Sequence, residues 1–277
     1  MLEVDLLKKE NSMSLPRANK NLGQHFLKDQ SVINKICNDF SDEAQLIYEV
    51  GPGPGILTKH LTNHELPFEV FEKDDRFPEL LADWVKPEDI HLCDATTIDF
   101  QKHQDESIHK GKKTWLVSNL PYNVGVPLLM NFIRSPNIKY MTLMLQKEVG
   151  LKIRPDTNKK KFKDMSSLMA LTQNYFDVKT LCLVPPGAFI PPPKVDSIVI
   201  SLKRLESPVI ALEQIDSYEK FLRALFQFKR KQIIKNISNL YSKEKIIESL
   251  EQLGLEPTLR AETFNLNQVQ LLYKKLN

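Results

Sequence analysis

The stretch Leu46-Ile-Tyr-Glu-Val-Gly-Pro-Gly-Pro-Gly-Ile-Leu-Thr-Lys59 predicts a buried strand that runs through a glycine turn into a helix. Four of its first five residues, Leu46, Ile47, Tyr48 and Val50, are apolar or β-forming. Its three glycines allow a tight turn and a close approach of the backbone to a ligand. The apolar residues after the glycines recur at helical spacing, at Ile56, Leu57 and Leu61. The stretch therefore predicts a ligand-binding loop at the carboxyl end of a strand.

The glycine spacing indicates what kind of ligand the loop takes. Dinucleotide-binding folds use G-x-G-x-x-G, and Ile56 occupies the place of the third glycine here. Pro52 and Pro54 remove two N–H donors that would bind phosphate. The carboxylate of Glu49 would repel phosphate but can meet an ammonium group. A nucleoside ligand without phosphates fits this pattern, while an ordinary strand-to-helix turn remains the alternative.

Length and composition favour two ordinary domains in a reducing compartment. The chain has 277 residues and three distant cysteines, Cys37, Cys93 and Cys182, without a C-x-x-C pair. They suggest neither a disulfide framework nor a zinc site. The first residues mix acids with bases, and no apolar run reaches the roughly 18 residues of a membrane span. We expect a soluble, cytoplasmic protein.

Charge is distributed unevenly along the chain. Residues 1–100 hold 10 Lys and Arg against 19 Asp and Glu, whereas residues 101–200 hold 15 against 7. This asymmetry predicts a basic face that contacts a polyanion such as RNA, although each basic cluster alone could be a solvated surface. The candidate RNA-facing residues are Lys159, Lys160, Lys161, Lys229, Arg230 and Lys231.

Strands and helices alternate through the first two thirds of the chain. Apolar segments at 67–71, 89–92, 114–118 and 138–145 read as further strands, with helices between them. One helix is expected to be capped by Ser31, and another to begin near Pro78 and to bury Leu80, Leu81 and Trp84. This order predicts a doubly wound α/β sheet.

The last third of the chain predicts a change of architecture. Residues 178–184 and 195–202 read as two antiparallel strands, joined by the proline-rich loop 185–194. After a linker at 205–208, helices are expected at 215–228, 231–240, 243–253 and 267–276. We therefore divide the chain into a flexible leader (1–20), a ligand-binding catalytic domain (21–204) and a helical C-terminal domain (205–277).

Polar residues follow three of the predicted strands. Glu72 lies about 20 residues past the glycine turn, where an acid binds ribose hydroxyls in nucleotide folds, and Asp94 can read a base amine. Asn119-Leu-Pro-Tyr122 combines acceptors with an aromatic face, which suits the exocyclic amine of a purine. In the proline-rich loop, Phe189 is positioned to sandwich an adenine against Tyr122, with a role as a core plug as the alternative.

Seven segments in order resemble the ribosomal RNA adenine dimethyltransferase family, and within it the bacterial enzymes that modify the small subunit. The resemblance runs from about residue 18 to the C-terminus. The segments are Asn21-Leu-Gly-Gln-His-Phe-Leu27, Glu49-Val-Gly-Pro-Gly-Pro-Gly55, Phe71-Glu72, Asp94-Ala95, Ser118-Asn-Leu-Pro-Tyr-Asn123, Met144-Leu-Gln-Lys-Glu-Val149 and Ala188-Phe-Ile-Pro-Pro-Pro-Lys-Val-Asp-Ser197.

The resemblance implies a fold and a reaction. The fold is a Rossmann-like class I methyltransferase sheet, mostly parallel with an antiparallel edge, plus a small all-α C-terminal domain. The reaction is S-adenosylmethionine-dependent N6,N6-dimethylation of two adjacent adenosines in a loop near the 3′ end of 16S rRNA, in ribosome biogenesis. The implied partner is small-subunit rRNA or a pre-ribosomal 30S particle. We expect a monomer that needs no metal.

The resemblance also implies site residues. His25 stands where many members carry Asn, and a ring nitrogen would take over that contact. Lys161-Phe-Lys-Asp164 replaces a Tyr-Gly pair of many relatives. The cofactor contacts are His25, Leu27, Gly51, Glu72, Asp94 and Asn119. From the residues themselves, rather than from the resemblance, we expect the catalytic residues that hold the adenine to be Asn119, Leu120, Pro121, Tyr122 and Phe189.

Three alternatives remain at this point. A large-subunit rRNA adenine methyltransferase of the macrolide-resistance type would share the cofactor motifs. A non-catalytic ribosome-assembly factor would not need the complete Asn119–Tyr122 segment. A nicotinamide oxidoreductase is disfavoured by the glycine spacing.

Overall fold

The computed structural model describes residues 16–19, 22–154, 165–228 and 231–277. Most of the predicted leader therefore lies outside the described residues. The same holds for Lys161-Phe-Lys-Asp164 and for five of the six candidate RNA-facing residues, namely Lys159, Lys160, Lys161, Lys229 and Arg230.

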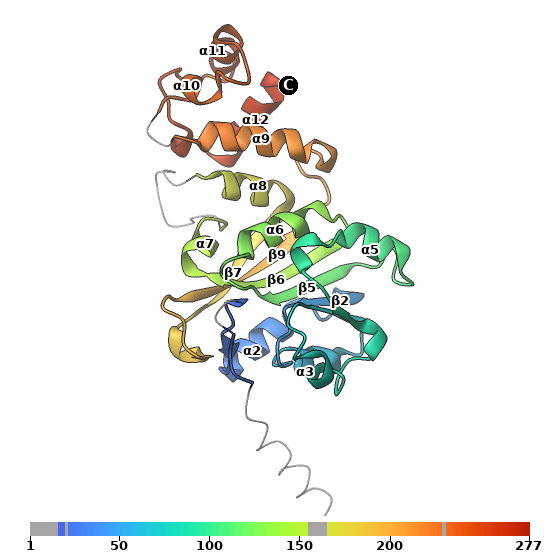
Figure 1. Cartoon of the computed structure of the whole chain (residues 1–277). Coiled ribbons are helices and arrows are strands. Elements are labelled where there is room, and N and C mark those ends of the chain that lie inside the picture. Colours follow the sequence, from blue (N-terminus) through green and yellow to red (C-terminus); the bar gives the residue numbers. More distant parts are fainter. Residues whose placement is uncertain (1–15, 20–21, 155–164, 229–230) are drawn as a thin grey trace, which may run out of the picture.

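A seven-stranded sheet forms the centre of the described structure (Figure 1). The strands follow the order β4-β3-β2-β5-β6-β9-β7, and those from β4 to β6 are all parallel. Strand β9 pairs antiparallel with both β6 and β7, which gives the antiparallel edge that was predicted. The strands are β2 (Leu46–Val50), β3 (Phe68–Glu72), β4 (Ile90–Leu92), β5 (Thr114–Asn119), β6 (Ile138–Gln146), β7 (Phe176–Val184) and β9 (Ser197–Arg204).

A second, two-stranded sheet pairs distant parts of the chain. Strand β1 (Phe26–Leu27) lies antiparallel to β8 (Phe189–Ile190). The helices are α2 (Gln30–Cys37), α3 (Thr58–Leu61), α4 (Pro78–Leu81), α5 (Phe100–Glu106), α6 (Gly125–Arg134), α7 (Lys147–Leu151), α8 (Ser167–Tyr175), α9 (Ile215–Phe226), α10 (Ile233–Ile237), α11 (Lys243–Gln252) and α12 (Leu266–Leu276).

Helices cover both faces of the large sheet, as the alternating pattern predicted. Figure 1 shows α5 and α6 on one side and α2 and α3 on the other. Because strand side chains alternate between the faces, Tyr48 and Leu116 pack with α5 and α6, whereas Ile47 and Trp115 pack with α2 and α3. The fold is therefore a three-layered α/β sandwich, and the prediction of a doubly wound sheet is confirmed.

Two local predictions were wrong. The cap of α2 is Asp29, which accepts hydrogen bonds from the backbone N–H groups of Ser31 and Val32, so Ser31 lies inside the helix instead of capping it. Trp84 remains 37% exposed, because α4 ends at Leu81 and the helical face predicted to bury it does not extend that far.

Of the C-terminal helices, α9 and α12 pack on α8, which itself covers the sheet, while α10 packs on α9 and α11 packs on α12. The buried side chain of Asn174 in α8 joins three segments. It accepts hydrogen bonds from Ile210 N (3.1 Å) and from Gln270 Nε2 in α12 (2.9 Å), and it donates one to the carbonyl of Ile210 (2.9 Å). The helical part thus shares one core with the sheet, and the division at residue 205 stays a prediction.

Segment lengths differ from the predictions mainly at helix ends. The helix predicted at 231–240 is α10 (Ile233–Ile237), and α9 ends at Phe226. Ser242 caps α11 as predicted, since its side chain accepts a hydrogen bond from Lys245 N. Within the described residues, no helix is both long enough and apolar enough to cross a membrane.

Helix α7 gives a stability test, because it approaches β9 closely at Gly150. A Cβ atom on Gly150 would lie 2.2 Å from Cγ2 of Ile198, which is fully buried. Alanine is normally favoured over glycine within a helix by up to about 1 kcal/mol. We expect Gly150→Ala to reverse that sign and to lower the free energy of unfolding by about 1–3 kcal/mol, because the core cannot accept the methyl group.

Urea denaturation measures this effect. The matched control is Gly187→Ala, because Gly187 has open space around its Cα and should change stability by less than about 0.5 kcal/mol. A stabilised Gly150→Ala variant would contradict the close packing of α7 on β9.

Candidate active site

One cavity opens at the carboxyl ends of the parallel strands β2, β3 and β5. The space within it, counted together with the adjoining open solvent, is about 1180 Å³. Nearly all of the predicted site residues line it, although they come from five separate segments. These are His25, Leu27, Gly51, Glu72, Asp94, Asn119, Leu120, Pro121 and Tyr122.

The glycine turn forms one wall of the cavity. Gly51, Gly53 and Gly55 all have positive φ angles, of 69°, 57° and 84°, which explains why glycine recurs at alternate positions. The buried carboxylate of Glu72 accepts a hydrogen bond from Gly53 N (2.9 Å) through Oε2. Its Oε1 accepts from the backbone N–H groups of Lys73 (2.8 Å) and Asp74 (2.7 Å). Glu72 therefore fixes the turn against the end of β3, and burial raises its pKa.

A second buried carboxylate, Glu49, lies at the base of the cavity. Its Oε2 accepts a hydrogen bond from the hydroxyl of Thr58 (2.7 Å). Burial, with a further contribution from the charge of Glu72, raises the pKa of Glu49 to about 8, although the Thr58 hydrogen bond opposes this. Two acids with raised pKa values in one cavity form a site that favours a cationic ligand, because a positive charge would let both ionise.

Asp94 lines the cavity just after β4, and it already has hydrogen-bond partners there. It accepts hydrogen bonds from the backbone N–H and hydroxyl of Thr96, and Lys73 Nζ lies 2.7 Å from its Oδ2. The hydrogen bond from Lys73 and those from Thr96 lower the pKa of Asp94 to about 2. An exocyclic amine that binds Asp94 would therefore compete with the exposed Lys73 side chain.

The side chain of Asn119 is held in a single orientation. Its Nδ2 lies 3.0 Å from the backbone carbonyl of His25. Because a carbonyl only accepts hydrogen bonds, the amide nitrogen must be the atom that faces it, and the assignment of Oδ1 follows. In the described part of the chain no donor is paired with this Oδ1, so it is available to an amine in the cavity.

Neighbouring groups complete this polar wall. The carbonyl of Pro121 accepts the N–H of Val124 (3.2 Å), whereas among the described residues no donor is paired with the carbonyl of Leu120. Tyr122 donates or accepts a hydrogen bond with Ser197 Oγ (2.6 Å), and its ring stacks on that of His25 with centroids 5.6 Å apart. Leu120 therefore offers the second acceptor near Asn119.

Phe189 is not part of the cavity wall. Its side chain is only 2% exposed and packs in the apolar cluster that contains Phe26 and Val199. Strand β8 pairs with β1, so the loop folds its aromatic ring into the core instead of presenting it to a base. A sandwich of adenine between Phe189 and Tyr122 does not fit this position, and the ring that faces Tyr122 is that of His25.

Several site residues were missed by sequence reasoning. Lys73 pairs with Asp94, and Thr58 bonds Glu49 across the glycine turn. Gln24 donates to Asp74 Oδ2 (2.7 Å), which ties the segment before β1 to the end of β3. Of these residues, only Gln24 could have been found from the sequence, because it lies in Asn21–Leu27, one of the segments that resemble the family. Among the candidate RNA-facing residues, Lys231 is described, and its exposed ammonium lies 4.0 Å from the centroid of the Phe228 ring.

Comparison with known proteins gives consistent matches. The family described as ribosomal RNA adenine dimethylase matches residues 16–277. The ribosomal RNA small subunit methyltransferase A of Macrococcus caseolyticus is 35% identical over 258 residues, which cover 90% of this chain and 86% of that protein. The protein of the same name from Staphylococcus aureus (strain MRSA252) is 32% identical over 266 residues, covering 92% and 89%.

Solved structures agree on the fold. The 23S rRNA methyltransferase ErmE superposes with a TM-score of 0.67 at 21% identity, over 91% of this chain and 99% of that one. A dimethyladenosine transferase from Plasmodium falciparum gives a TM-score of 0.70 at 22% identity, over 90% and 96%. The mostly parallel sheet and the C-terminal helices thus form the fold shared by these methyltransferases.

The raised pKa of Glu49 predicts a pH-dependent stability. A glutamate side chain ordinarily has a pKa of 4.5, which applies to the unfolded chain, whereas the pKa of Glu49 is about 8 in the folded protein. Between these two pH values the folded state therefore binds more protons than the unfolded state. The contribution of Glu49 to the free energy of unfolding therefore falls as pH rises from about 4.5 to about 8. We expect Glu49→Gln to be more stable than the wild type at pH 8, by on the order of 1–3 kcal/mol, and to differ less at pH 5.

Urea denaturation of the ligand-free protein at both pH values tests this. Gln keeps an acceptor for Thr58, and the exposed Glu251 provides a matched control as Glu251→Gln. If the stability difference between wild type and Glu49→Gln were the same at pH 5 and pH 8, the raised pKa would be wrong.

Proposed function

The chain belongs to the ribosomal RNA adenine dimethylase family and is an rRNA adenine dimethyltransferase, and we propose that its substrate is the small ribosomal subunit. In this proposal it converts two adjacent adenosines in a loop near the 3′ end of 16S rRNA to N6,N6-dimethyladenosine, with S-adenosylmethionine as methyl donor. The small-subunit assignment is supported by two relatives, 35% and 32% identical, that are both named small subunit methyltransferases.

The composition of the cavity fits this cofactor. S-adenosylmethionine supplies a methyl group made electrophilic by a sulfonium centre, and it carries a positive charge but no phosphate. Glu49 and Glu72 are buried beside the glycine turn, whose two prolines cannot donate hydrogen bonds. We propose that Glu72 binds the ribose hydroxyls, that Asp94 binds the adenine amine, and that the N-terminal segment at His25 and Leu27 closes over the ligand.

The observation that carries the proposal is the fixed orientation of Asn119. Its Oδ1, held by the bond from Nδ2 to the His25 carbonyl, can accept one N–H of the substrate amine. The carbonyl of Leu120 can accept the other. Two acceptors orient the nitrogen lone pair along the direction of attack, and this fixed geometry supplies much of the catalysis. Tyr122 would contact the face of the base, as aromatic side chains do for extruded nucleotides.

The methyl transfer to N6 needs no side chain that acts as a base. The cofactor would supply the methyl carbon that N6 attacks, and the electron pair of the broken carbon–sulfur bond would stay on sulfur. The N6 proton would then leave to water. The side chains of Asn119 and Tyr122 therefore position the amine and exclude water from it, and neither has to act as a base.

The partner and the setting are part of the same proposal. The protein would act as a monomer in the cytoplasm on rRNA or on a pre-ribosomal 30S particle. The exposed Lys231 beside Phe228 fits contact with RNA phosphates, in the region where Lys229 and Arg230 were also predicted to act.

The decisive experiment transfers labelled methyl groups from S-adenosylmethionine to undermethylated small and large ribosomal subunits side by side, and identifies the modified nucleoside. Dimethyladenosine confined to small-subunit RNA is the expected result. Labelling of the large subunit instead would favour an enzyme of the macrolide-resistance type. Labelling of neither, with cofactor binding intact, would favour an assembly factor.

Asn119 gives the sharpest test of the site. We expect Asn119→Ala to slow methyl transfer by about 10²-fold or more, because the substrate amine loses a preorganised acceptor. The measurement is the single-turnover rate at saturating cofactor and RNA. The exposed Asn34 on α2 provides the matched control, Asn34→Ala, which should leave the rate unchanged. An unaltered rate in Asn119→Ala would rule out the proposed role.

A further inference from the structure

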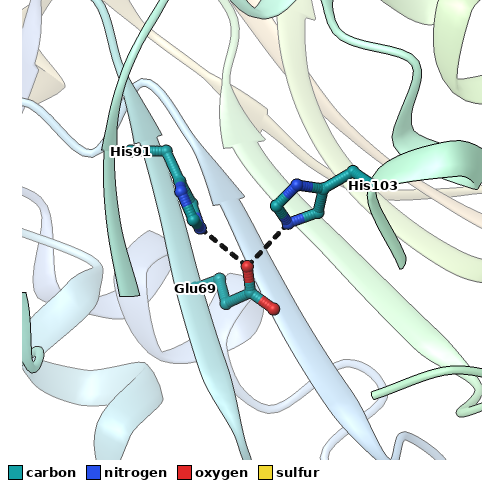
Figure 2. Close-up of side chains that lie close together, drawn as sticks. All are labelled: Glu69, His91 and His103. Atoms are coloured by element: carbon teal, nitrogen blue, oxygen red, sulfur yellow. Dashed lines mark hydrogen bonds and ion pairs between the residues drawn. The ribbon is translucent and has the colours of Figure 1, made fainter. Parts of the chain in front are cut away.

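A cluster of histidines surrounds a buried glutamate on the face of the sheet covered by α5. Nε2 of His91 lies 2.7 Å from Oε2 of Glu69, and Nε2 of His103 lies 2.8 Å from the same oxygen. Figure 2 shows the two imidazole rings on either side of the carboxylate, each with a nitrogen directed at that one atom. The three ligand atoms lie within 4.8 Å of one another. This is the spacing of groups that can share one metal ion.

The other half of the carboxylate lacks a hydrogen bond. Oε1 of Glu69 is buried without a partner, and Nε2 of His109 faces it at 3.9 Å, which is beyond hydrogen-bonding distance. Nδ1 of His109 and the hydroxyl of Tyr48, whose ring contacts that of His103, are also buried without partners. Unsatisfied buried groups are rare in proteins, and several around one carboxylate point to an ion or water among them.

The surrounding structure holds these side chains in place. Glu69 and Phe71 are two residues apart in β3, so their side chains project from the same face. His91 lies in the neighbouring strand β4 and pairs with Phe71, so its side chain projects from that face too. His103 comes from α5. Buried Gln104 fixes the loop after α5, since its Nε2 donates to the carbonyls of His109 (3.0 Å) and Lys112 (2.8 Å). The loop is thereby held with His109 over Glu69.

We propose that Glu69, His91, His103 and His109 form a binding site for a divalent transition-metal ion of the Zn²⁺ type. Three imidazoles and one carboxylate suit Zn²⁺ and related ions, and do not suit Mg²⁺ or Ca²⁺, which prefer oxygen ligands. Tetrahedral Zn²⁺ with bonds of about 2.0–2.1 Å keeps its ligand atoms roughly 3.3 Å apart. Without an ion, Nε2 of His91 and of His103 lie 2.7 and 2.8 Å from Oε2 of Glu69, and Nε2 of His109 lies 3.9 Å from Oε1, so an ion would lengthen the first two separations and shorten the third.

The site is separate from the cavity, whose lining includes none of these four residues. Its four protein ligands leave no position for substrate, which is the arrangement of structural zinc sites. The ion would join β3, β4, α5 and the loop after α5, close to the sheet edge formed by β4. Its function is therefore to stabilise this edge. The sequence had predicted no metal, so the proposal departs from that expectation.

The experiment uses the full-length protein treated with a chelator and then titrated with Zn²⁺ or Co²⁺. We expect one equivalent to bind, Co²⁺ to give the intense visible absorption of a tetrahedral centre, and Zn²⁺ at 100 times its dissociation constant to raise the melting temperature by about 5 °C. His91→Gln and His103→Gln should each weaken binding by about 10²-fold or more, and Glu69→Gln should also weaken it.

Two measurements keep the test decisive. His60→Gln is the matched control, because His60 lies outside both the cluster and the cavity lining, and it should bind as the wild type does. Binding of S-adenosylmethionine, or the far-ultraviolet circular dichroism spectrum, verifies that each variant is folded. If the wild type bound no equivalent of either ion, or if binding survived in both His91→Gln and His103→Gln, the proposal would be wrong.

Discussion

The shape of the cavity depends on the hydrogen bonds that the carboxylate of Glu72 accepts. A buried carboxylate is costly unless donors surround it, and here the donors are backbone N–H groups from the glycine turn and from the residues after β3. The turn can supply Gly53 N only because its glycines adopt positive φ angles. One side chain thus fixes the shape of the loop and leaves the open ends of β2 and β3 facing the same space.

A second constraint links the residue before β1 to the end of β5. The backbone carbonyl of His25 accepts from Asn119, while the ring Nδ1 of His25 lies 2.8 Å from the carbonyl of Pro191. Since that carbonyl only accepts, Nδ1 must carry the proton, which leaves Nε2 of the neutral ring as an acceptor. His25 therefore connects the strand-end amide with the proline-rich loop. A histidine at this position can fix both neighbours at once, through its backbone and its ring.

The sequence predicted those features that depend on local pattern. The strand–turn–helix unit and the alternating elements follow from periodicity, and Glu72, Asp94 and Asn119 were identified because parallel strands bring their carboxyl ends to one edge. Features set by packing were harder to predict, and the burial of Phe189 was considered only as the alternative. The burial of Phe189 depends on the pairing of β8 with β1, and the exposure of Trp84 depends on where α4 stops. Neither has a signature in the residues nearby.

The histidine cluster, which lies away from the cavity, is also a feature that the sequence did not predict. Glu69, His91, His103 and His109 span 41 positions without a recognisable metal-binding spacing. Strand register puts Glu69 and His91 on one face, and the docking of α5 adds His103. Glu69 lies at the second position of β3 and Glu72 at the last, with side chains on opposite faces because their separation is odd. One short strand therefore serves two distinct polar sites, since the alternation of its side chains keeps them on opposite sides of the sheet.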